Sequence, residues 1–170
     1  MINGTFTLDP THTTIGFIVR HAMVTKVRGQ FNDFESTING DSVSATIKSA
    51  SIDTNNAERD AHVKGEDFFN VEQFPEMTFK STSFDVDDNG NGTVTGDLTI
   101  KGITKPVTLD VETEGTAEDP FGNLRLGFEA KTKINRTDFG IDFNAPLNTG
   151  GVMLSDEIKI EIDGSAIKQA

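Results

Sequence analysis

The stretch that decides the fold is residues 51–81, SIDTNNAERDAHVKGEDFFNVEQFPEMTFKS, because it is the only part of the chain whose pattern predicts a helix. It holds one of the three histidines, the adjacent Arg59 and Asp60, and four of the thirteen phenylalanines. Strand-like sequence flanks it on both sides. We therefore expect a short helical insert within a β protein.

The ends of this helix can be predicted from capping residues. Asn55 is the expected N-cap, with Glu58 at the third helical position, and Gly65 is expected to end the helix. Two helical turns are not stable alone in water. The helix is therefore expected to dock on the strands through the apolar residues Val63, Phe68, Phe69 and Phe74.

Outside the insert, apolar and polar residues alternate with a period of two, as they do in strands with one buried face. Three such segments precede the insert and five follow it, at residues 15–19, 27–31, 43–47, 78–86, 94–100, 107–111, 124–130 and 158–162. Their connections are short, with turn residues at Asn89-Gly90 and Lys101-Gly102, which favours antiparallel pairing.

The predicted fold class is all-β. We expect an eight-stranded antiparallel lipocalin-like barrel with the helical insert between the third and fourth strands. A β-sandwich is the alternative. A chain of 170 residues without a linker is expected to form one domain over residues 1–170.

The charge is acidic and uneven along the chain. The net charge is −12, of which residues 1–64 carry −1 and residues 65–170 carry −11. An acidic chain has no general electrostatic attraction for nucleic acid or for an anionic membrane, and no nucleic-acid partner is expected. Any site for an anion is expected to use basic residues of the N-terminal part.

Several features bear on the compartment. Cysteine is absent, so disulfide and thiolate chemistry are excluded. The first residues lack the charged and apolar regions of a signal peptide, and no apolar run is long enough to span a membrane. The chain as given is expected to be soluble and cytoplasmic, or periplasmic or secreted if a signal was removed.

The aromatic composition consists of thirteen phenylalanines without tyrosine or tryptophan. Buried tyrosine and tryptophan need partners for their polar atoms, and phenylalanine does not. This composition suits a long, dry cavity, and it equally suits a core that phenylalanine simply fills.

The histidines are the first residues to consider for chemistry. His12, His21 and His62 have no spacing typical of metal ligands, so no metal site is expected. His21 follows the apolar positions of residues 15–19, where it suits either a ligand head group or a structural hydrogen bond. No nucleophile elbow, HExxH motif or phosphate loop is present, so no catalytic residue is assigned. Acid–base catalysis by His21, Asp60 and His62 stays open as an alternative.

A set of short motifs occurs in order along the whole chain. They are THTTIGF at residues 11–17 with RH at 20–21, VRGQF at 27–31, SIDT at 51–54, RDAHV at 59–63, DFF at 67–69, FPEMTFKS at 74–81, GDLTIKG at 96–102 and RTDFG at 136–140. This ordered set resembles the YceI family of lipocalin-like polyisoprenoid-binding proteins.

The resemblance implies a barrel with an apolar tunnel that holds a long isoprenoid lipid, either a polyprenyl phosphate or an isoprenoid quinone. It implies a lipid-binding or transport role, no required cofactor, and a possible homodimer. Alternatives are an enzyme acting on such a lipid or quinone and a stress-related interaction protein that has a vestigial cavity and no ligand.

Strand alternation and motif position together give the candidate site residues. The expected tunnel residues are Ile15, Phe17, Val19, Phe31, Phe68, Phe69, Phe79, Leu98, Leu109, Leu126 and Phe128. The expected head-group or polar contacts are Arg20, His21, Arg59, Asp60, His62 and Arg136.

Overall fold

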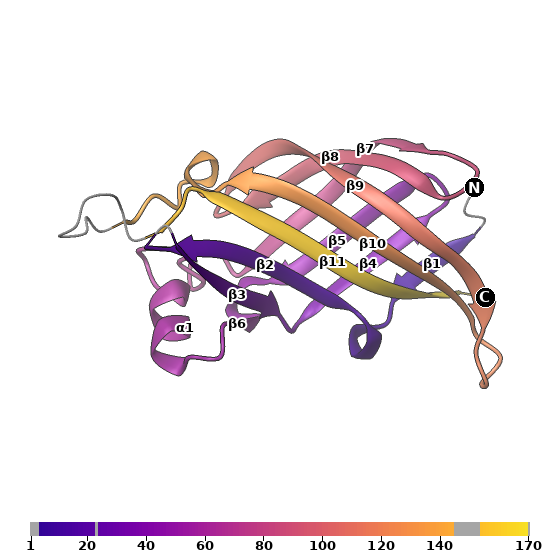
Figure 1. Ribbon diagram of the computed structural model, residues 1–170, viewed down its shortest axis with the longest axis horizontal. Helices are drawn as coiled ribbons and strands as arrows, with labels where there is room; N and C mark the ends of the chain where they lie inside the picture. The colour runs from indigo at the N-terminus through magenta and orange to yellow at the C-terminus, as the bar shows by residue number, and fades with distance from the viewer. Residues whose placement is uncertain (1–3, 23, 145–153, 170) are drawn as a thin grey trace.

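The computed structural model describes residues 4–22, 24–144 and 154–169, whose strands form one antiparallel sheet (Figure 1). The strands are β1 (Thr5–Leu8), β2 (Thr14–His21), β3 (Thr25–Phe31), β4 (Phe34–Asn39), β5 (Ser42–Lys48), β6 (Ile52–Asp53), β7 (Glu76–Val86), β8 (Asn91–Ile100), β9 (Ile103–Glu118), β10 (Leu124–Asn135) and β11 (Glu157–Lys168). The helices are α1 (Ala57–Lys64) and the 3₁₀ turns η1 (Pro10–His12), η2 (Ser49–Ser51) and η3 (Arg136–Phe139).

These strands make an eight-stranded barrel, because three barrel strands are each broken into two pieces. The first consists of β1 and β2, separated by η1; the second of β3 and β4; and the third of β5 and β6, separated by η2. β2 pairs with β3 and β1 with β4, so the broken strands remain neighbours.

The last strand, β11, closes the barrel. β11 pairs with β10 on one side and with both β1 and β2 on the other. The predicted eight-stranded antiparallel barrel is therefore confirmed, with α1 between the third and fourth barrel strands, and the sandwich alternative is wrong.

The helix α1 begins one residue later than the sequence predicts. The N-cap is Asn56, whose side chain accepts a hydrogen bond from the backbone N–H of Arg59 at 3.0 Å. Asn55 takes a left-handed conformation with φ of 62°, which asparagine tolerates, and this turn precedes the capping residue. Gly65 does end the helix, but in an extended conformation.

The interior is packed in two clusters. A small one, formed by Phe6, Ile38, Leu126 and Ala166, lies at the end of the barrel where the two termini meet, which we call the closed end (Figure 1). A larger one lies towards α1 and includes Phe31, Phe68 and Phe139. The space between these clusters is where the candidate site lies.

Candidate functional site

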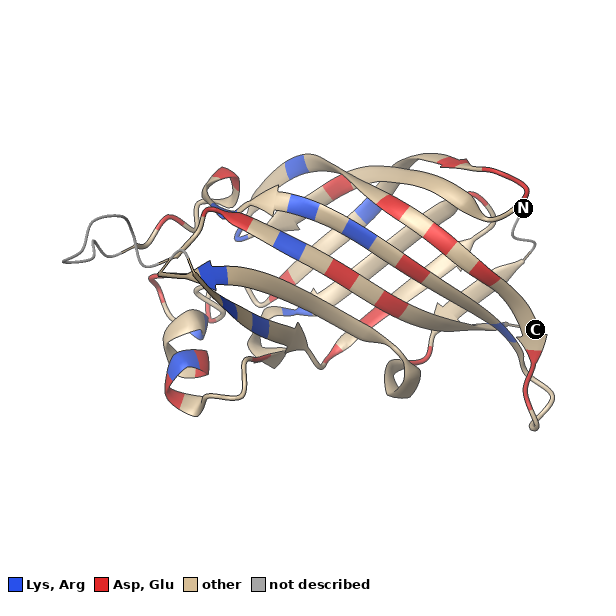
Figure 2. Ribbon diagram, viewed as in Figure 1, with Lys and Arg blue, Asp and Glu red and all other residues tan. Residues whose placement is uncertain are grey.

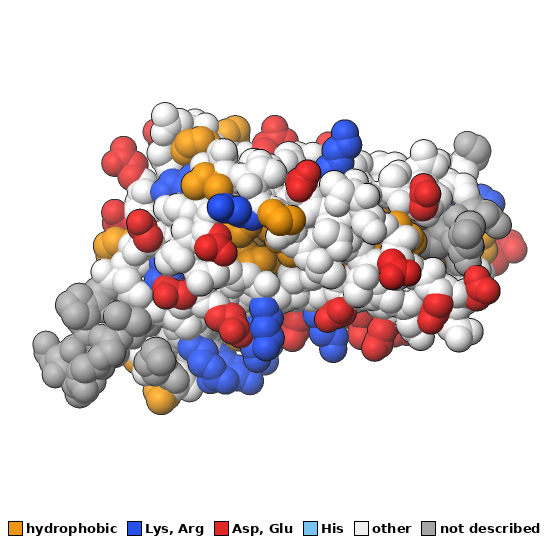
Figure 3. Space-filling view, turned by 90° about the horizontal axis from the view of Figure 1, so that it is seen from above, with side chains coloured by type: hydrophobic (Ala, Val, Ile, Leu, Met, Phe, Trp, Pro, Cys, Tyr) orange, Lys and Arg blue, Asp and Glu red, His pale blue; other side chains and the backbone are white. Residues whose placement is uncertain are grey.

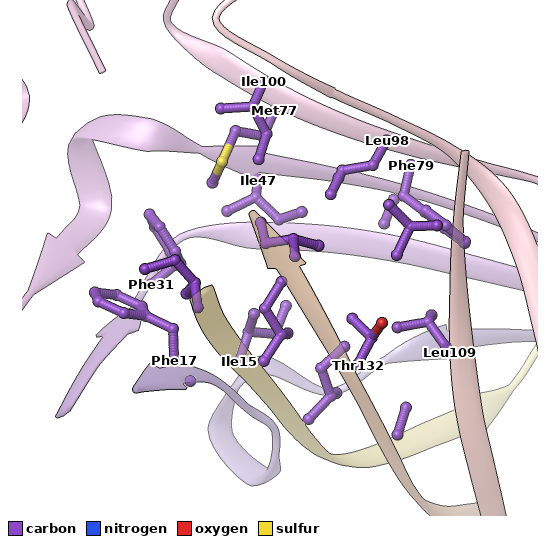
Figure 4. Close-up of a pocket in the computed structure, with 18 of the residues that line it drawn as sticks. Ile15, Phe17, Phe31, Ile47, Met77, Phe79, Leu98, Ile100, Leu109 and Thr132 are labelled. Atoms are coloured by element: carbon purple, nitrogen blue, oxygen red, sulfur yellow. The ribbon is translucent and has the colours of Figure 1, made fainter. Parts of the chain in front are cut away.

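An apolar cavity of about 450 Å³ lies inside the barrel and is lined by side chains from every strand named above. Figure 4 shows side chains such as Phe17, Met77 and Leu109, from three different strands, pointing into the same space. Along β10 the lining extends from Leu126 to Ile134, which is about 26 Å of strand. The volume lies in the range of about 300–1,000 Å³ that is usual for ligand sites.

Glycines in the wall help to keep this cavity open. A Cβ atom added to Gly29 would lie 2.3 Å from the ring of Phe17, and one added to Gly164 would lie 2.3 Å from the ring of Phe128. A Cβ atom added to Gly96 would likewise lie 2.5 Å from the ring of Phe79. Each ring therefore lies over a glycine, in the space that a side chain at that position would take. The ring then occupies less of the barrel interior. Glycine at an inward-facing strand position, as at Gly29, is the sequence signal for this arrangement.

Hydroxyl groups in the cavity wall already have partners within the protein. The Ser36 hydroxyl donates to the Ser44 carbonyl at 2.8 Å, and the Thr132 hydroxyl donates to the Thr108 carbonyl at 2.8 Å. Among the described residues, no buried side-chain nitrogen or oxygen lacks a hydrogen-bond partner. The middle of the cavity therefore offers a ligand mainly apolar contacts, which suits a hydrocarbon chain.

Basic side chains line the cavity only at the end covered by α1, as far as the described residues show. His21, Arg59 and His62 lie there, and the side chain of His62 is 48% exposed. We call this end of the cavity the mouth. It places polar groups where the head of an elongated amphipathic ligand would lie.

Thr54 joins Arg59 and Asp60 beside the mouth. Asp60 Oδ1 accepts hydrogen bonds from the Thr54 backbone N–H at 2.9 Å and from its hydroxyl at 2.6 Å. Arg59 donates from Nε to the Thr54 hydroxyl at 2.8 Å and from Nη2 to its carbonyl at 2.7 Å. Thr54 is buried, so these bonds attach α1 to the barrel. Sequence reasoning missed Thr54, since no motif property singled it out.

His62 lies on the same helix but has different partners. Its Nε2 is 2.9 Å from Asp67 Oδ2, and its ring meets those of Phe68 and Phe143 edge-on at 5.1 and 5.2 Å between centroids. Asp60 is bonded to Thr54 instead, so the two groups of the hypothetical acid–base set on α1 do not contact each other.

Arg136 is buried and lines the cavity, but its donors are largely used by the backbone. Nη1 donates to the carbonyls of Ile141 and Phe143 at 2.8 Å each, and Nε donates to the carbonyl of Ser155 at 3.0 Å. Nη2 is 3.4 Å from Asp156 Oδ1. These bonds hold the segment after η3 at the mouth.

All eleven residues predicted to line the tunnel do line the cavity. Of the six polar residues, His21, Arg59, His62 and Arg136 line it. Arg20 and Asp60 do not: Arg20 is exposed, and the Asp60 carboxylate is bonded to Thr54. The cavity is not filled by side chains, which is the arrangement that would have favoured the stress-related alternative.

The closed end carries a charge network of its own. Arg125 donates from Nη1 to Asp9 at 2.9 Å and from Nε to Asp119 at 2.7 Å. The Arg125 guanidinium holds the pKa of Asp9 far below its usual range. The backbone N–H of Asn123, together with Arg125, lowers the pKa of Asp119 to about 2. Both carboxylates raise the pKa of Arg125 in turn.

Neither a metal cluster nor a spanning helix is found in the described part of the chain. No group of three or more histidine or acidic side chains there could hold a metal ion. No helix there is long and apolar enough to cross a membrane.

Comparisons with known proteins agree with this architecture. The chain matches the YceI-like domain family over residues 6–166. A UPF0312 protein of Staphylococcus aureus is 42% identical over 164 residues, which cover 92% of this chain and 93% of that protein. The crystal structure of a Campylobacter jejuni YceI protein is 34% identical, with a TM-score of 0.77 over 89% of this chain and 90% of that one.

A more distant structure shares the fold alone. It is a polyisoprenoid binding domain from Saccharophagus degradans, which is 12% identical, with a TM-score of 0.72 over 96% of this chain and 98% of that domain. The match over residues 6–166, together with the identity to the Staphylococcus aureus protein, shows that the chain belongs to the YceI-like domain family.

Proposed function

We propose that the protein binds a long isoprenoid lipid, a polyprenyl phosphate or an isoprenoid quinone, and carries or sequesters it without changing it chemically. The observation that carries the proposal is the apolar cavity of about 450 Å³, whose basic lining groups lie at its mouth. The shared fold of the polyisoprenoid binding domain from Saccharophagus degradans supports the same ligand class.

Burial of the tail would supply most of the binding free energy. Each buried methylene contributes about 0.8 kcal/mol, so one five-carbon isoprene unit contributes roughly 3–4 kcal/mol before the costs of binding. Affinity should therefore rise with each isoprene unit until the cavity is full and then level off.

The head group would lie at the mouth, beside His21 and Arg59. An anionic phosphate there gains from the Arg59 guanidinium, although the net charge of −12 opposes it. A neutral quinone head needs no cation. In either case the eleven tunnel residues named above would contact the tail.

Native mass spectrometry and isothermal titration calorimetry with farnesol and geranylgeraniol test the tail site. Ala45 lines the cavity, whereas Ser44 next to it is exposed on the outer side of β5. Ala45→Phe should fill the cavity and weaken binding at least about tenfold, and Ser44→Phe should leave it unchanged. The proposal is wrong if the wild-type protein binds neither alcohol, or if the two variants bind equally.

The head-group contact is tested by comparing geranylgeranyl phosphate with the corresponding alcohol. Arg59→Ala should weaken binding of the phosphate more at low salt than at high salt, since screening reduces the charge interaction. Binding of the alcohol should hardly change. An equal loss for both ligands at all salt concentrations would remove Arg59 from the head-group site.

A further inference from the structure

Basic side chains gather on the outer surface beside the mouth. We call this surface the basic face, and it consists of Arg20 on β2, Lys26 and Arg28 on β3, Lys133 on β10 and Lys159 on β11. Each alternates with residues that line the cavity, so these side chains lie on the outside of the barrel. Figure 2 shows Lys and Arg positions on β2, β3, β10 and β11 in the half of the molecule that carries α1.

The strand register places these charges next to one another. Lys133 lies opposite Lys159, and Arg20 lies opposite Lys26. Like charges in directly opposite positions destabilise a sheet, so folding alone does not account for them. Lys133 is 3.8 Å from Glu157. The other four members of the basic face form no ion pair with any described residue.

Acidic side chains occupy the same sheet nearer the closed end. Asp163, Glu129 and Glu112 lie opposite one another on β11, β10 and β9. Figure 2 shows this separation along the strands, and Figure 3 shows Lys and Arg side chains gathered along one edge of the molecule. On the outer face of these strands the positive side therefore lies towards the mouth, although the molecule has a net charge of −12 and α1 itself carries Glu58 and Asp60. Near an anionic surface this polarity would turn the mouth towards that surface.

Two hairpin tips expose large apolar side chains, one at each end. Val24, at the tip between β2 and β3, is 78% exposed and lies between Arg20 and Lys26 in sequence. Phe121, at the tip between β9 and β10, is 87% exposed and follows Glu118 and Asp119. An apolar tip flanked by cations suits the boundary between lipid head groups and acyl chains, whereas an acidic tip is repelled there.

We propose that the basic face and Val24 dock the mouth of the barrel onto an anionic lipid bilayer. Docking itself depends on the outer surface alone. Its purpose, which is transfer of an isoprenoid tail between the bilayer and the cavity, rests on the proposed function. A bilayer fits better than a nucleic acid, because it accepts both the cations and an inserted valine.

Flotation with phosphatidylcholine vesicles, with and without phosphatidylglycerol, tests this docking. The wild-type protein should bind the anionic vesicles at low salt and release them at high salt, and it should not bind the neutral vesicles. The triple variant Lys26→Glu, Arg28→Glu, Lys159→Glu should bind more than about tenfold more weakly. The matched variant Lys80→Glu, Lys105→Glu, Lys168→Glu has the same net charge and should bind within about twofold of wild type.

The hairpin tips provide a second comparison. Val24→Asp should weaken vesicle binding severalfold, and Phe121→Asp should not. The docking proposal is overturned if anionic vesicles are not bound, if the two triple variants or the two tip variants lose binding equally, or if a DNA duplex is bound as tightly as the vesicles. A protein that binds farnesol but no vesicles refutes docking alone, and one that binds vesicles but no isoprenoid refutes the proposed function alone.

Discussion

The two ends of the barrel are closed in different ways. At the closed end, Phe6, Ile38, Leu126 and Ala166 pack together in the interior. The larger buried cluster lies towards the mouth and includes Phe31 and Phe68, but no residue of α1 itself is buried. This helix is attached through the partly buried Val63 and through the hydrogen bonds of Arg59 and Asp60 to Thr54. Packing resists opening along its whole area, whereas a few polar bonds can exchange with water. The difference implies that global stability and access to the cavity depend on separate sets of residues.

The largest effect is expected from breaking the closed end. Phe6 is 2% exposed, and Phe6→Ala should lower the free energy of unfolding by about 3–5 kcal/mol, because it leaves a cavity in a packed cluster. Chemical denaturation measures this loss. Phe121→Ala removes an exposed ring and should change stability by less than about 0.5 kcal/mol. Equal losses in both variants would contradict the packing account of this end.

A smaller and more local effect is expected at the mouth. Asp60→Ala removes the acceptor for both hydrogen bonds from Thr54 and should cost about 1–3 kcal/mol. Hydrogen exchange should become faster in α1 and β6 and stay unchanged in β1 and β11. Glu58→Ala, on the same helix, is the control. Faster exchange at both ends would show that the mouth is not an independent unit.

The charge network predicts a pH dependence that belongs to the closed end. The pKa values of Asp9 and Asp119 are lowered by folding from about 3.8, so their stabilisation is nearly complete above about pH 5 and is lost progressively as the pH falls through the lowered pKa values of the folded state. Arg125→Met should make the free energy of unfolding depend less on pH in this range. It should also move the midpoint of acid unfolding by up to about one pH unit. Lys131→Met serves as the control. An unchanged pH profile for Arg125→Met would exclude the network as its cause.

The smallest effect is expected in the wall between the two ends. Gly29→Ala forces the ring of Phe17 to move, and a movement into the cavity should weaken isoprenoid binding a few-fold, with a stability cost of about 1–2 kcal/mol. At Gly127 the nearest atom to an added Cβ is 3.7 Å away, so Gly127→Ala should have little effect on binding. Isothermal titration with geranylgeraniol compares the two variants, and similar affinities would show that Phe17 adapts without loss of volume.

The sequence predicts the barrel and its lining well, because both follow from a local pattern. The interior of a barrel receives every second residue, so Phe17, Leu109 and Phe128 could be placed inside from alternation alone. The breaks between β1 and β2 and between β3 and β4 were not predicted, since they depend on which strand each half pairs with.

The long-range polar contacts at the two ends of the barrel could not be predicted from local pattern. At the mouth, Arg136 bonds to the carbonyl of Ser155, which is nineteen positions away, and at the closed end Arg125 bonds to Asp9, which is 116 positions away. Such partners come together only when the strands pair and the barrel closes. The role of Arg20 could not be predicted from local pattern either. Its outward position indicates a charged surface only when the sheet brings Lys26 and Lys159 close to it.

The cavity also determines how the protein should respond to hydrostatic pressure. An unfilled apolar volume of about 450 Å³ is lost when the chain unfolds, and compression favours the state of smaller volume. The ligand-free protein should therefore unfold at moderate pressure, and a bound hydrocarbon should raise the required pressure by occupying that volume. Compressibility would then report occupancy of the barrel without a label or a chromophore.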